Sequence, residues 1–436
     1  MSIESKPTEK HAHADVYGFA VRGSDGLFVG IERALDNGYG VVFVVDEAAT
    51  VTGITDLECM RDAMRQGEHL AGVRMQDIAK PVDQATGSGE VTPVLGKDGQ
   101  LMGVKTEPNS SLLPVAEPDL SHAEFRNVMD AYLSTWISSQ GSYLGEFETR
   151  FARRCEMSQG VSTSNGTVAL HLALAALGIG EGDDVIVPDL TFAACANTVI
   201  HVGARPILAD VDPDTWCLSV ETIEQAMTSR TRAIMPVHVF GRPAPMTEIA
   251  EFARSRGLFV IEDCAEAHGA QYDGKTVGSF SDISCFSFFA NKIMTTGEGG
   301  ICLTNDADLA ARMRMLRDHG MRPERRYWHE EAGFNFRMTN LQAAIGCAQL
   351  DRLDELLSQR RKIYSDYQEA FKDVAQVTFP TTLPARFEPV VWFTSILVPP
   401  DRRNSAIDAC RSHNIDIRPF TNGLSSMPAY RRYARA

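Results

Sequence analysis

The feature that most constrains the fold is a regular alternation of apolar runs with amphipathic segments from Thr167 onward. Such an alternation is typical of a mainly parallel sheet with helices on both faces. The expected strands are 184–188, 205–210, 232–239 and 258–263, and the expected helices are 168–177, 192–202, 307–317 and 340–372. Ligands of such sheets gather at the carboxyl ends of strands, where Asp263 falls. The sequence therefore predicts an α/β domain with a site at that edge.

Composition excludes several classes of function. The 436 residues carry a formal net charge of -15, which disfavours nucleic-acid binding because counterion release requires a basic surface. The nine cysteines include no C-x-x-C pair, so we expect reduced thiols and no metal site. No apolar run approaches the roughly 20 residues of a membrane helix, and the first residues are too polar for a signal peptide. We therefore expect a cytoplasmic protein of two or more domains that contacts no membrane.

The chain changes character several times along its length. Residues 1–14 are polar and expected to be disordered, and 108–112, which are rich in turn formers, are the expected linker between two parts. Residues 113–375 form the expected large domain. Residues 376–436, with a strand-like run at 389–398 and a helix at 402–413, form the expected smaller α+β segment.

Residues 15–107 have a pattern of their own. A short helix at 31–38 precedes two apolar strands at 40–45 and 50–55, and Asp56 opens another helix. This order resembles a CBS module, and 91–105 resembles a clipped second copy that keeps two strands and their turn. The resemblance implies that the module binds an adenine nucleotide. A structural or dimerising appendage without a ligand is the alternative.

Lys292 and Asp263 carry the strongest chemical signal. Lys292 lies in a turn rich in glycine and threonine, and Asp263 ends an apolar run. A lysine in such a place can form a Schiff base with an aldehyde. An acid at a strand end can keep a pyridine nitrogen protonated, so the pair suits pyridoxal phosphate (PLP) and transamination. Taken singly, the lysine is a surface charge and the aspartate a cap.

Four further residues suit the rest of that cofactor. Gly166 and Thr167 open a helix, where free amides and the helix dipole favour a phosphate dianion, unless Asn165 or Thr167 only caps the helix. Ser287 can donate its hydroxyl to the same phosphate, or it is a buried hydroxyl bonded to backbone. Phe192 can stack on the flat face of the ring, or it belongs to the core.

Ordered segments across residues 113–436 carry a family resemblance. They are 136–139, 164–174, 236–241, 262–270, 291–300 and 327–340. These segments resemble the DegT-type nucleotide-sugar aminotransferases, which are fold-type I PLP enzymes, and within that family they are most similar to the GDP-perosamine synthase branch. The resemblance implies an incomplete C-terminal small domain at 376–436, because the chain stops at Ala436, before the final strand and helix of the family.

The same resemblance implies a role for each matching residue. Lys292 holds the cofactor, Asp263 contacts its pyridine nitrogen, and Glu266 lies near its ring hydroxyl, where a shared proton would make the charge tolerable. Asn335 reaches the phosphate of the neighbouring subunit, so a homodimer with shared active sites is expected. The residues expected near the sugar nucleotide are Trp136, Ser138, His329 and Arg337.

The function implied is transfer of the amino group of L-glutamate to C4 of a nucleotide-linked 4-keto-6-deoxysugar, GDP-4-keto-6-deoxymannose in particular, for a surface polysaccharide. Dehydratases of the wider family have histidine in place of Lys292, so the lysine favours the aminotransferase. Two alternatives stay open. One is an aminotransferase for another UDP- or dTDP-linked keto-sugar or at C3, and the other is a catalytically silent nucleotide-sensing protein.

Overall fold

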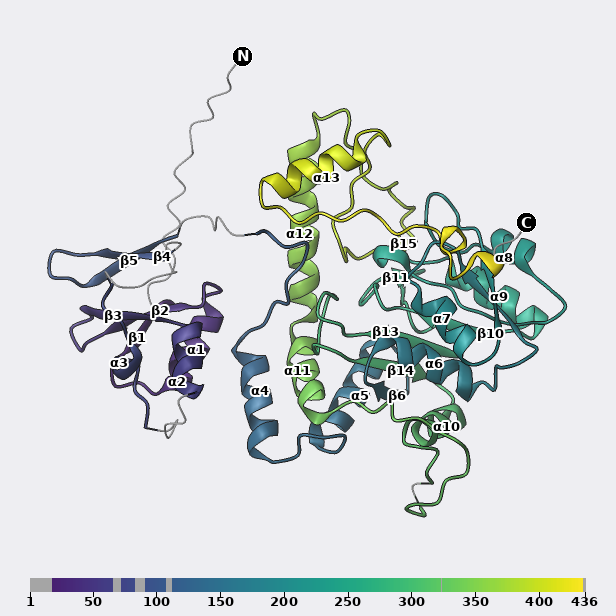
Figure 1. Ribbon diagram of the computed structural model, residues 1–436, viewed down its shortest axis with the longest axis horizontal. Helices are drawn as coiled ribbons and strands as arrows, with labels where there is room; N and C mark the ends of the chain where they lie inside the picture. Colours follow the sequence, from purple (N-terminus) through teal and green to yellow (C-terminus); the bar gives the residue numbers. More distant parts are fainter. Residues whose placement is uncertain (1–17, 66–71, 83–90, 107–111, 323, 434–436) are drawn as a thin grey trace. The chain divides into compact units, whose positions relative to one another are not determined.

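The structure is a computed structural model that describes residues 18–65, 72–82, 91–106, 112–322 and 324–433 (Figure 1). The chain divides into two compact units. One comprises Met1–Ser111 with Leu120–Arg126, and the other comprises Leu112–Asp119 with Asn127–Ala436. The expected disordered tail at 1–14 and residues 108–111 of the expected linker lie outside the described residues.

The larger unit is built on a seven-stranded sheet with the order β6-β14-β13-β10-β9-β7-β8. Only the pairs made by β14 are antiparallel, so one reversed strand lies inside an otherwise parallel sheet. The strands are β6 (Gln159–Thr163), β7 (Asp184–Pro188), β8 (Arg205–Ala209), β9 (Thr231–Ile234), β10 (Phe259–Asp263), β13 (Ile283–Ser287) and β14 (Gly300–Thr304). The predicted α/β architecture forms, and β14 makes the sheet mixed.

Helices cover both faces of this sheet because successive strand residues point to opposite sides. Ile283 and Cys285 of β13 pack with one group of helices, whereas Phe286 packs on the opposite face. The first group is α6 (Gly166–Ala176), α7 (Ala194–His201) and α10 (Ala307–Arg317). On the other face lie α5 (Ser142–Arg154) and α11 (Asn340–Asp351), with α8 (Val220–Ala226) and α9 (Met246–Arg256) further along the sheet. Burial on both faces explains why the strands read as unbroken apolar runs.

The helix expected over 340–372 is interrupted. It forms as α11 and α12 (Leu353–Phe371), because the backbone at Arg352 leaves helical geometry with φ of -99° and ψ of 2°. After this break Leu353, Leu356 and Leu357 all lie in the core. The periodicity of the sequence continues through the break and therefore did not reveal it.

The strand expected at 389–398 does not form. The short strand β15 (Phe387–Glu388) pairs with β11 (Gln271–Tyr272), which pairs in turn with β12 (Lys275–Thr276). Beyond β15, the N–H of Val390 donates to the carbonyl of Gly241 at 3.0 Å, and Trp392 packs into the core. The apolar run is thus buried by separate loop contacts rather than by a ladder. Helix α13 (Arg403–Ser412) follows.

The smaller unit contains a three-stranded sheet in the order β1-β2-β3 and a separate hairpin of β4 and β5. Val42 and Val44 of β2 face a core with α1 and α2, whereas Val41 and Phe43 face a core with the hairpin. The elements are β1 (Ala20–Arg22), α1 (Leu27–Asp36), β2 (Val41–Val45), β3 (Val51–Asp56), α2 (Leu57–Arg65), α3 (Met75–Ile78), β4 (Val91–Leu95) and β5 (Leu101–Thr106). Helix, strand, strand, helix and hairpin follow in the expected order, and the likeness to a CBS module stays a prediction.

The first turn of α4 (His122–Leu133) belongs to this unit, where Phe125 packs against Phe28 and Arg126 pairs with Glu32 at 3.1 Å. Among the described helices of the whole chain, none is both long enough and apolar enough to cross a bilayer.

Candidate active site

Three strand ends bring the predicted cofactor residues to one edge of the large sheet. Asp263 is the last residue of β10 and Ser287 the last residue of β13, and these two strands are parallel neighbours. Gly166 begins α6 directly after β6. The carboxyl edge of the sheet is where open α/β folds bind their ligands.

Lys292 lies in the loop between β13 and β14 with only 11% of its side chain exposed. Its Nζ is 3.9 Å from Oε1 of Glu266 and 3.8 Å from the ring centroid of Trp392. Burial lowers the pKa of Lys292, and the carboxylates of Glu266 and Asp263 partly oppose that shift. A lowered pKa increases the fraction of neutral amine, which is the nucleophilic form.

Asp263 is almost fully buried and already holds two hydrogen bonds. Its Oδ1 accepts from the N–H of Ala265 at 3.0 Å, and its Oδ2 accepts from the thiol of Cys195 at 3.1 Å. Burial and the neighbouring carboxylate raise the pKa of Cys195, so this thiol keeps its proton and donates it. Each carboxylate oxygen retains a lone pair for a cationic N–H.

Glu266 also lies close to Lys292. Its Oε2 accepts from the N–H of Phe240 at 2.7 Å, and Phe240 adopts a left-handed backbone with φ of 55°. Burial raises the pKa of Glu266, while the charge of Lys292 and this N–H oppose the shift. The side chain is thus poised to share a proton with a neighbouring oxygen.

The start of α6 has the geometry of a phosphate cradle. A Cβ built on Gly166 would lie 2.6 Å from Cβ of Ser287, so only glycine lets the Ser287 hydroxyl stand beside the first turn. Asn165 caps the helix by accepting from the N–H of Val168 at 3.0 Å. That bond leaves the N–H groups of Gly166 and Thr167 for another acceptor. Capping and phosphate binding are therefore compatible, and the residues fit PLP.

Phe192 follows β7, and the residue is 71% exposed, which leaves its ring open to a flat ligand. The other five predicted residues form a second group around the segment between α10 and α11. Arg337 pairs with Asp318 at 2.9 Å and donates from Nε to Oδ1 of Asn335 at 2.9 Å. In the described structure, no side-chain hydrogen bond or ion pair of this group reaches Lys292, Asp263 or Glu266. Other contacts of the group include those of His329 Nδ1 with the carbonyl of His319, and of the Trp136 and Ser138 carbonyls with Asn340.

Comparison with known proteins places the chain. Residues 118–436 match the model of the DegT/DnrJ/EryC1/StrS aminotransferase family. The chain belongs to this family. GDP-perosamine synthase from Escherichia coli O157:H7 is 45% identical over 328 residues, which are 73% of this chain and 87% of the relative. GDP-perosamine synthase from Caulobacter vibrioides is 46% identical over 327 residues, 74% of this chain and 88% of the relative.

A solved structure of the putative sugar aminotransferase Spr1654 from Streptococcus pneumoniae, in its PLP form, has a TM-score of 0.69 and 27% identity. The match covers 74% of this chain and 88% of that one. The DegT-family chain is therefore a PLP-dependent sugar aminotransferase, as its sequence predicted, and PLP is its cofactor.

Three residues of this DegT-family site are not predicted by the sequence. Trp392 lies under the Lys292 ammonium and donates from Nε1 to the carbonyl of Asn291 at 2.8 Å. Trp392 belongs to the run that is predicted as a strand, and that prediction does not say which way its side chain points. The contacts of Phe240 with Glu266 and of Cys195 with Asp263 join residues 26 and 68 positions apart. No local pattern signals either contact.

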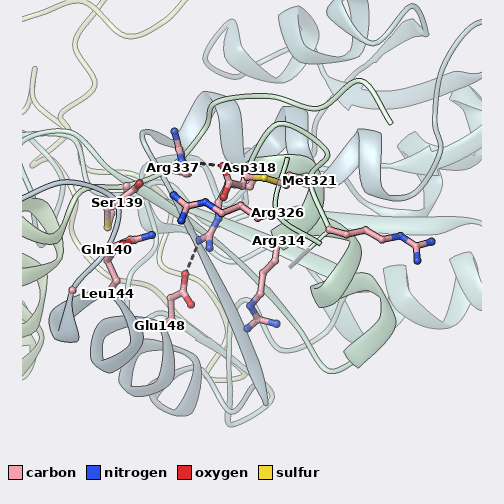
Figure 2. A pocket seen from close by; sticks show the side chains of 13 residues that line it. Ser139, Gln140, Leu144, Glu148, Arg314, Asp318, Met321, Arg326 and Arg337 are labelled. Atoms are coloured by element: carbon pink, nitrogen blue, oxygen red, sulfur yellow. Dashed lines mark hydrogen bonds and ion pairs between the residues drawn. The ribbon is translucent and has the colours of Figure 1, made fainter. Parts of the chain in front are cut away.

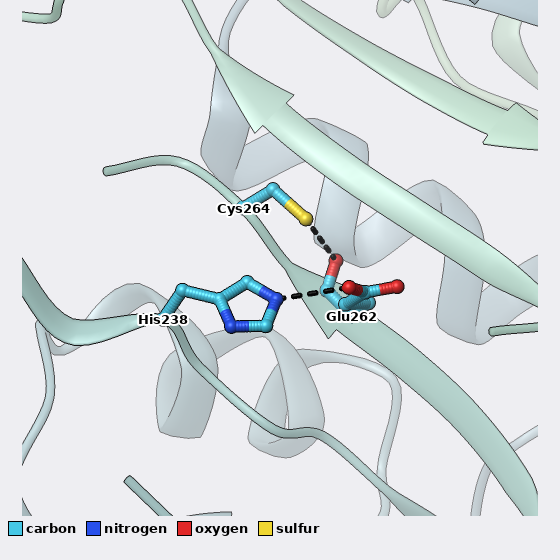
Figure 3. Close-up of side chains that lie close together, drawn as sticks. All are labelled: His238, Glu262 and Cys264. Atoms are coloured by element: carbon cyan, nitrogen blue, oxygen red, sulfur yellow. Dashed lines mark hydrogen bonds and ion pairs between the residues drawn. The ribbon is translucent and has the colours of Figure 1, made fainter. Parts of the chain in front are cut away.

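A buried cluster of His238, Glu262 and Cys264 lies beside Asp263 and has the residue types of a metal site (Figure 3). His238 Nδ1 accepts from the N–H of Ala244 at 3.0 Å, so its Nε2 carries the proton and donates to Glu262 at 2.9 Å. Further donors to Glu262 are the N–H groups of Gly278 and Phe280 and the hydroxyl of Ser281. With these lone pairs used, the cluster acts as a hydrogen-bonded brace for the end of β10.

Proposed function

We propose that the chain transfers the amino group of L-glutamate to C4 of GDP-4-keto-6-deoxymannose and so produces GDP-perosamine, a precursor of surface polysaccharide. The observation that carries the chemistry is the buried amine of Lys292, 3.9 Å from Glu266 and 3.8 Å from the Trp392 ring centroid. Support for the substrate comes from relatives named GDP-perosamine synthase at 45% and 46% identity. All nine cysteines are free thiols, which suits a reducing cytoplasm.

Lys292 and Asp263 perform the central steps of this proposal. When bound, PLP withdraws electrons from the carbon that loses a proton. Lys292 would hold the cofactor through its aldehyde carbon, and its free amine would carry the proton that leaves Cα of glutamate to the cofactor carbon that receives it. Asp263 holds a proton on the pyridine nitrogen, and Cys195 and Ala265 fix the carboxylate in position.

The other cofactor residues hold and orient the ring and phosphate. The phosphate is bound by Gly166, Thr167 and Ser287 at the N-terminal, positive end of the α6 dipole. Phe192 stacks on the ring. Glu266 shares a proton with the ring hydroxyl, which agrees with its raised pKa.

The second group of predicted residues serves the partner's cofactor, through Asn335, and the sugar-nucleotide substrate. We place Asn335 at the partner's cofactor phosphate, so the functional unit is a homodimer with shared sites. Trp136, Ser138, His329 and Arg337 lie near the sugar nucleotide. This arrangement agrees with the lack of side-chain hydrogen bonds and ion pairs between this group and Lys292 among the described residues of one chain.

A substrate panel tests this function. The purified chain is incubated with L-glutamate and with GDP-, UDP- and dTDP-linked 4-keto-6-deoxyhexoses, and the products are analysed by mass. We expect preferential amination of GDP-4-keto-6-deoxymannose with release of 2-oxoglutarate. Preference for a UDP- or dTDP-linked sugar, or amination at C3, would select the first alternative. Cofactor uptake without any product would select the nucleotide-sensing protein.

The smaller unit is proposed to be a CBS-like module that binds an adenine nucleotide. The support is its order of helix, two strands, helix and hairpin. Titration of the full chain with AMP and ATP, followed by calorimetry, tests this idea. Absence of binding would leave a structural or dimerising appendage.

A further inference from the structure

The backbone that carries Lys292 is held by a side chain from a distant helix. Arg360 of α12 donates from Nη2 to the carbonyl of Lys292 at 3.3 Å. The same guanidinium donates from Nη1 to the carbonyl of Trp392 at 2.5 Å. One side chain therefore joins the loop between β13 and β14 to the segment that follows β15.

A second hydrogen bond joins these two segments in the opposite direction. The indole Nε1 of Trp392 donates to the carbonyl of Asn291, the residue before Lys292, at 2.8 Å. The centroid of the same ring lies 3.8 Å from Nζ of Lys292. Arg360, Trp392 and the Asn291–Lys292 backbone thus form a closed set of contacts that includes the amine.

The surrounding core holds this set of contacts in place. Trp392 packs in the same buried cluster as Ile293, which follows Lys292 in the chain. Leu356 and Leu357, which precede Arg360 on α12, belong to that cluster as well. The helix and both segments are therefore packed against one another, so the bonds of Arg360 have a fixed framework.

The surroundings of Arg360 indicate why an arginine stands here. Burial lowers the pKa of Arg360, and it forms no ion pair with the carboxylates that the structure describes. Its printed acceptors are two neutral carbonyls, to which a charged donor bonds more strongly than a neutral one does. The planar fork of a guanidinium group reaches two acceptors at once, whereas lysine offers a single ammonium.

We propose that Arg360 is a positioning residue for amino transfer, which holds the Trp392 ring against the Lys292 amine and so fixes the place of that amine in the site. The inference rests on the proposed role of Lys292. Because a displacement of about 1 Å can slow a reaction about a hundredfold, loss of these bonds should lower kcat more than it changes the binding of glutamate.

The glutamate half-reaction tests the effect on rate. Arg360→Met removes both donors and keeps an unbranched stem, so we expect the rate at saturating glutamate to fall about thirty- to a hundredfold, with KM changed less than twofold. Arg360→Lys keeps the charge and one donor group and should lose only about fivefold. Arg361→Met, which replaces the next residue of α12, an exposed arginine, is the matched control and should stay within twofold.

The reactivity of the Lys292 amine gives a readout that does not depend on activity. The full chain, freed of cofactor, is acetylated with acetic anhydride across a pH series, and the peptides are analysed by mass. Burial lowers the pKa of Lys292 in the unaltered chain. In Arg360→Met the midpoint should rise by about one unit, because water reaches the amine once the Trp392 ring is released. Acetylation of the exposed Lys275 is the internal reference.

A purely structural role predicts a different result. Arg360→Met would then unfold at a lower temperature, while the rate of the folded chain and the Lys292 midpoint would match those of the unaltered chain, and that result overturns the proposal. An equal loss of rate in Arg361→Met overturns it too. If Arg360→Met does not fold, Arg360→Lys and Trp392→Phe take its place, and an unchanged midpoint in both rejects the role.

The proposed function fails separately. The acetylation midpoint of Lys292 is measured without cofactor, glutamate or sugar nucleotide. A midpoint that shifts in Arg360→Met, in a chain that releases no 2-oxoglutarate from glutamate, would remove the aminotransferase reaction and leave the contact between Arg360, Trp392 and Lys292 standing.

Discussion

The Lys292 site and a pocket of about 600 Å³ that Arg317, Arg337 and Asp318 help to line (Figure 2) hold similar ionisable groups in different surroundings. The side chains of Lys292 and Glu266 are 11% and 12% exposed. Burial lowers the pKa of Lys292 and raises that of Glu266, so both shifts favour the neutral forms. In the pocket, Arg337 and Asp318 are 31% and 36% exposed and form an ordinary ion pair. Desolvation therefore tunes the groups around Lys292, whereas the ion pairs in the pocket wall remain partly hydrated.

The largest expected effect tests the buried side of that comparison. Lys292→Ala should reduce amino transfer by at least about a thousandfold, because it removes both the nucleophile and the base. The rate of 2-oxoglutarate release measures the loss. Lys275→Ala, which replaces an exposed lysine, should be neutral.

Borohydride reduction followed by peptide mass analysis locates the cofactor link. The pyridoxyl group should be found on the peptide that contains Lys292. A label on any other lysine would remove the central assignment.

Asp263→Asn should lower kcat by about a hundred- to a thousandfold, since a neutral amide cannot hold a charged pyridinium. Steady-state kinetics at saturating glutamate measure the effect. Asp273→Asn is a useful comparison, because Asp273 is an exposed carboxylate paired with Arg386 at 2.7 Å. Equal losses in the two variants would contradict a specific role for Asp263.

Gly166→Ala should weaken PLP binding about tenfold and lower the stability of the fold by about 1–3 kcal/mol, because the new Cβ would meet Ser287 at 2.6 Å. Cofactor titration and thermal unfolding measure the two effects. Gly145→Ala is the matched control, since a Cβ there meets nothing within 4 Å and alanine favours the helix. An unchanged affinity in Gly166→Ala would argue against the phosphate cradle.

Acid should destabilise the fold through His268. Burial among Phe151, Phe286 and Phe288, together with the charge of Lys292, lowers the pKa of His268 to about 3 from its ordinary value of 6.5. Between these values the unfolded state binds the proton and the folded state does not, so stability falls as the pH drops below 6.5. The slope reaches at most about 1.4 kcal/mol per pH unit.

Thermal unfolding between pH 7 and pH 4 tests this linkage. The profile of His268→Phe should be flatter than that of the unaltered chain, whatever the absolute stability of the variant. Parallel profiles would show that His268 titrates normally in the fold.

The smallest expected effect concerns the support of Asp263. Cys195→Ala removes the thiol that donates to Oδ2 at 3.1 Å and should lower kcat two- to fivefold, because a thiol is a weak donor. Cys195→Ser keeps a donor and should retain most of the activity. A loss in the serine variant as large as in alanine would point to packing rather than to hydrogen bonding.

Much of the fold was predictable because apolar runs mark the positions of strands along the chain. The ends of β10 and of α10 fell within one residue of their expected positions. The reversed direction of β14 could not be predicted, because the sequence of a buried strand does not show whether it runs parallel or antiparallel to its neighbours. The break at Arg352 could not be predicted either, because the helical periodicity of the sequence continues through it. Lys292, Asp263 and Gly166 were predicted because local chemistry marks them, whereas Trp392 and Cys195 reach the site only through long-range packing.

The amino-acid sequence alone determined the family and the cofactor and predicted which lysine reacts, since each depends on residue types in short ordered segments. Only the tertiary structure decided that Trp392 underlies the amine, that Cys195 holds the aspartate, and that Arg337 and Asp318 pair in the wall of one pocket. Those features depend on which distant segments meet, and the packing of the whole core determines that.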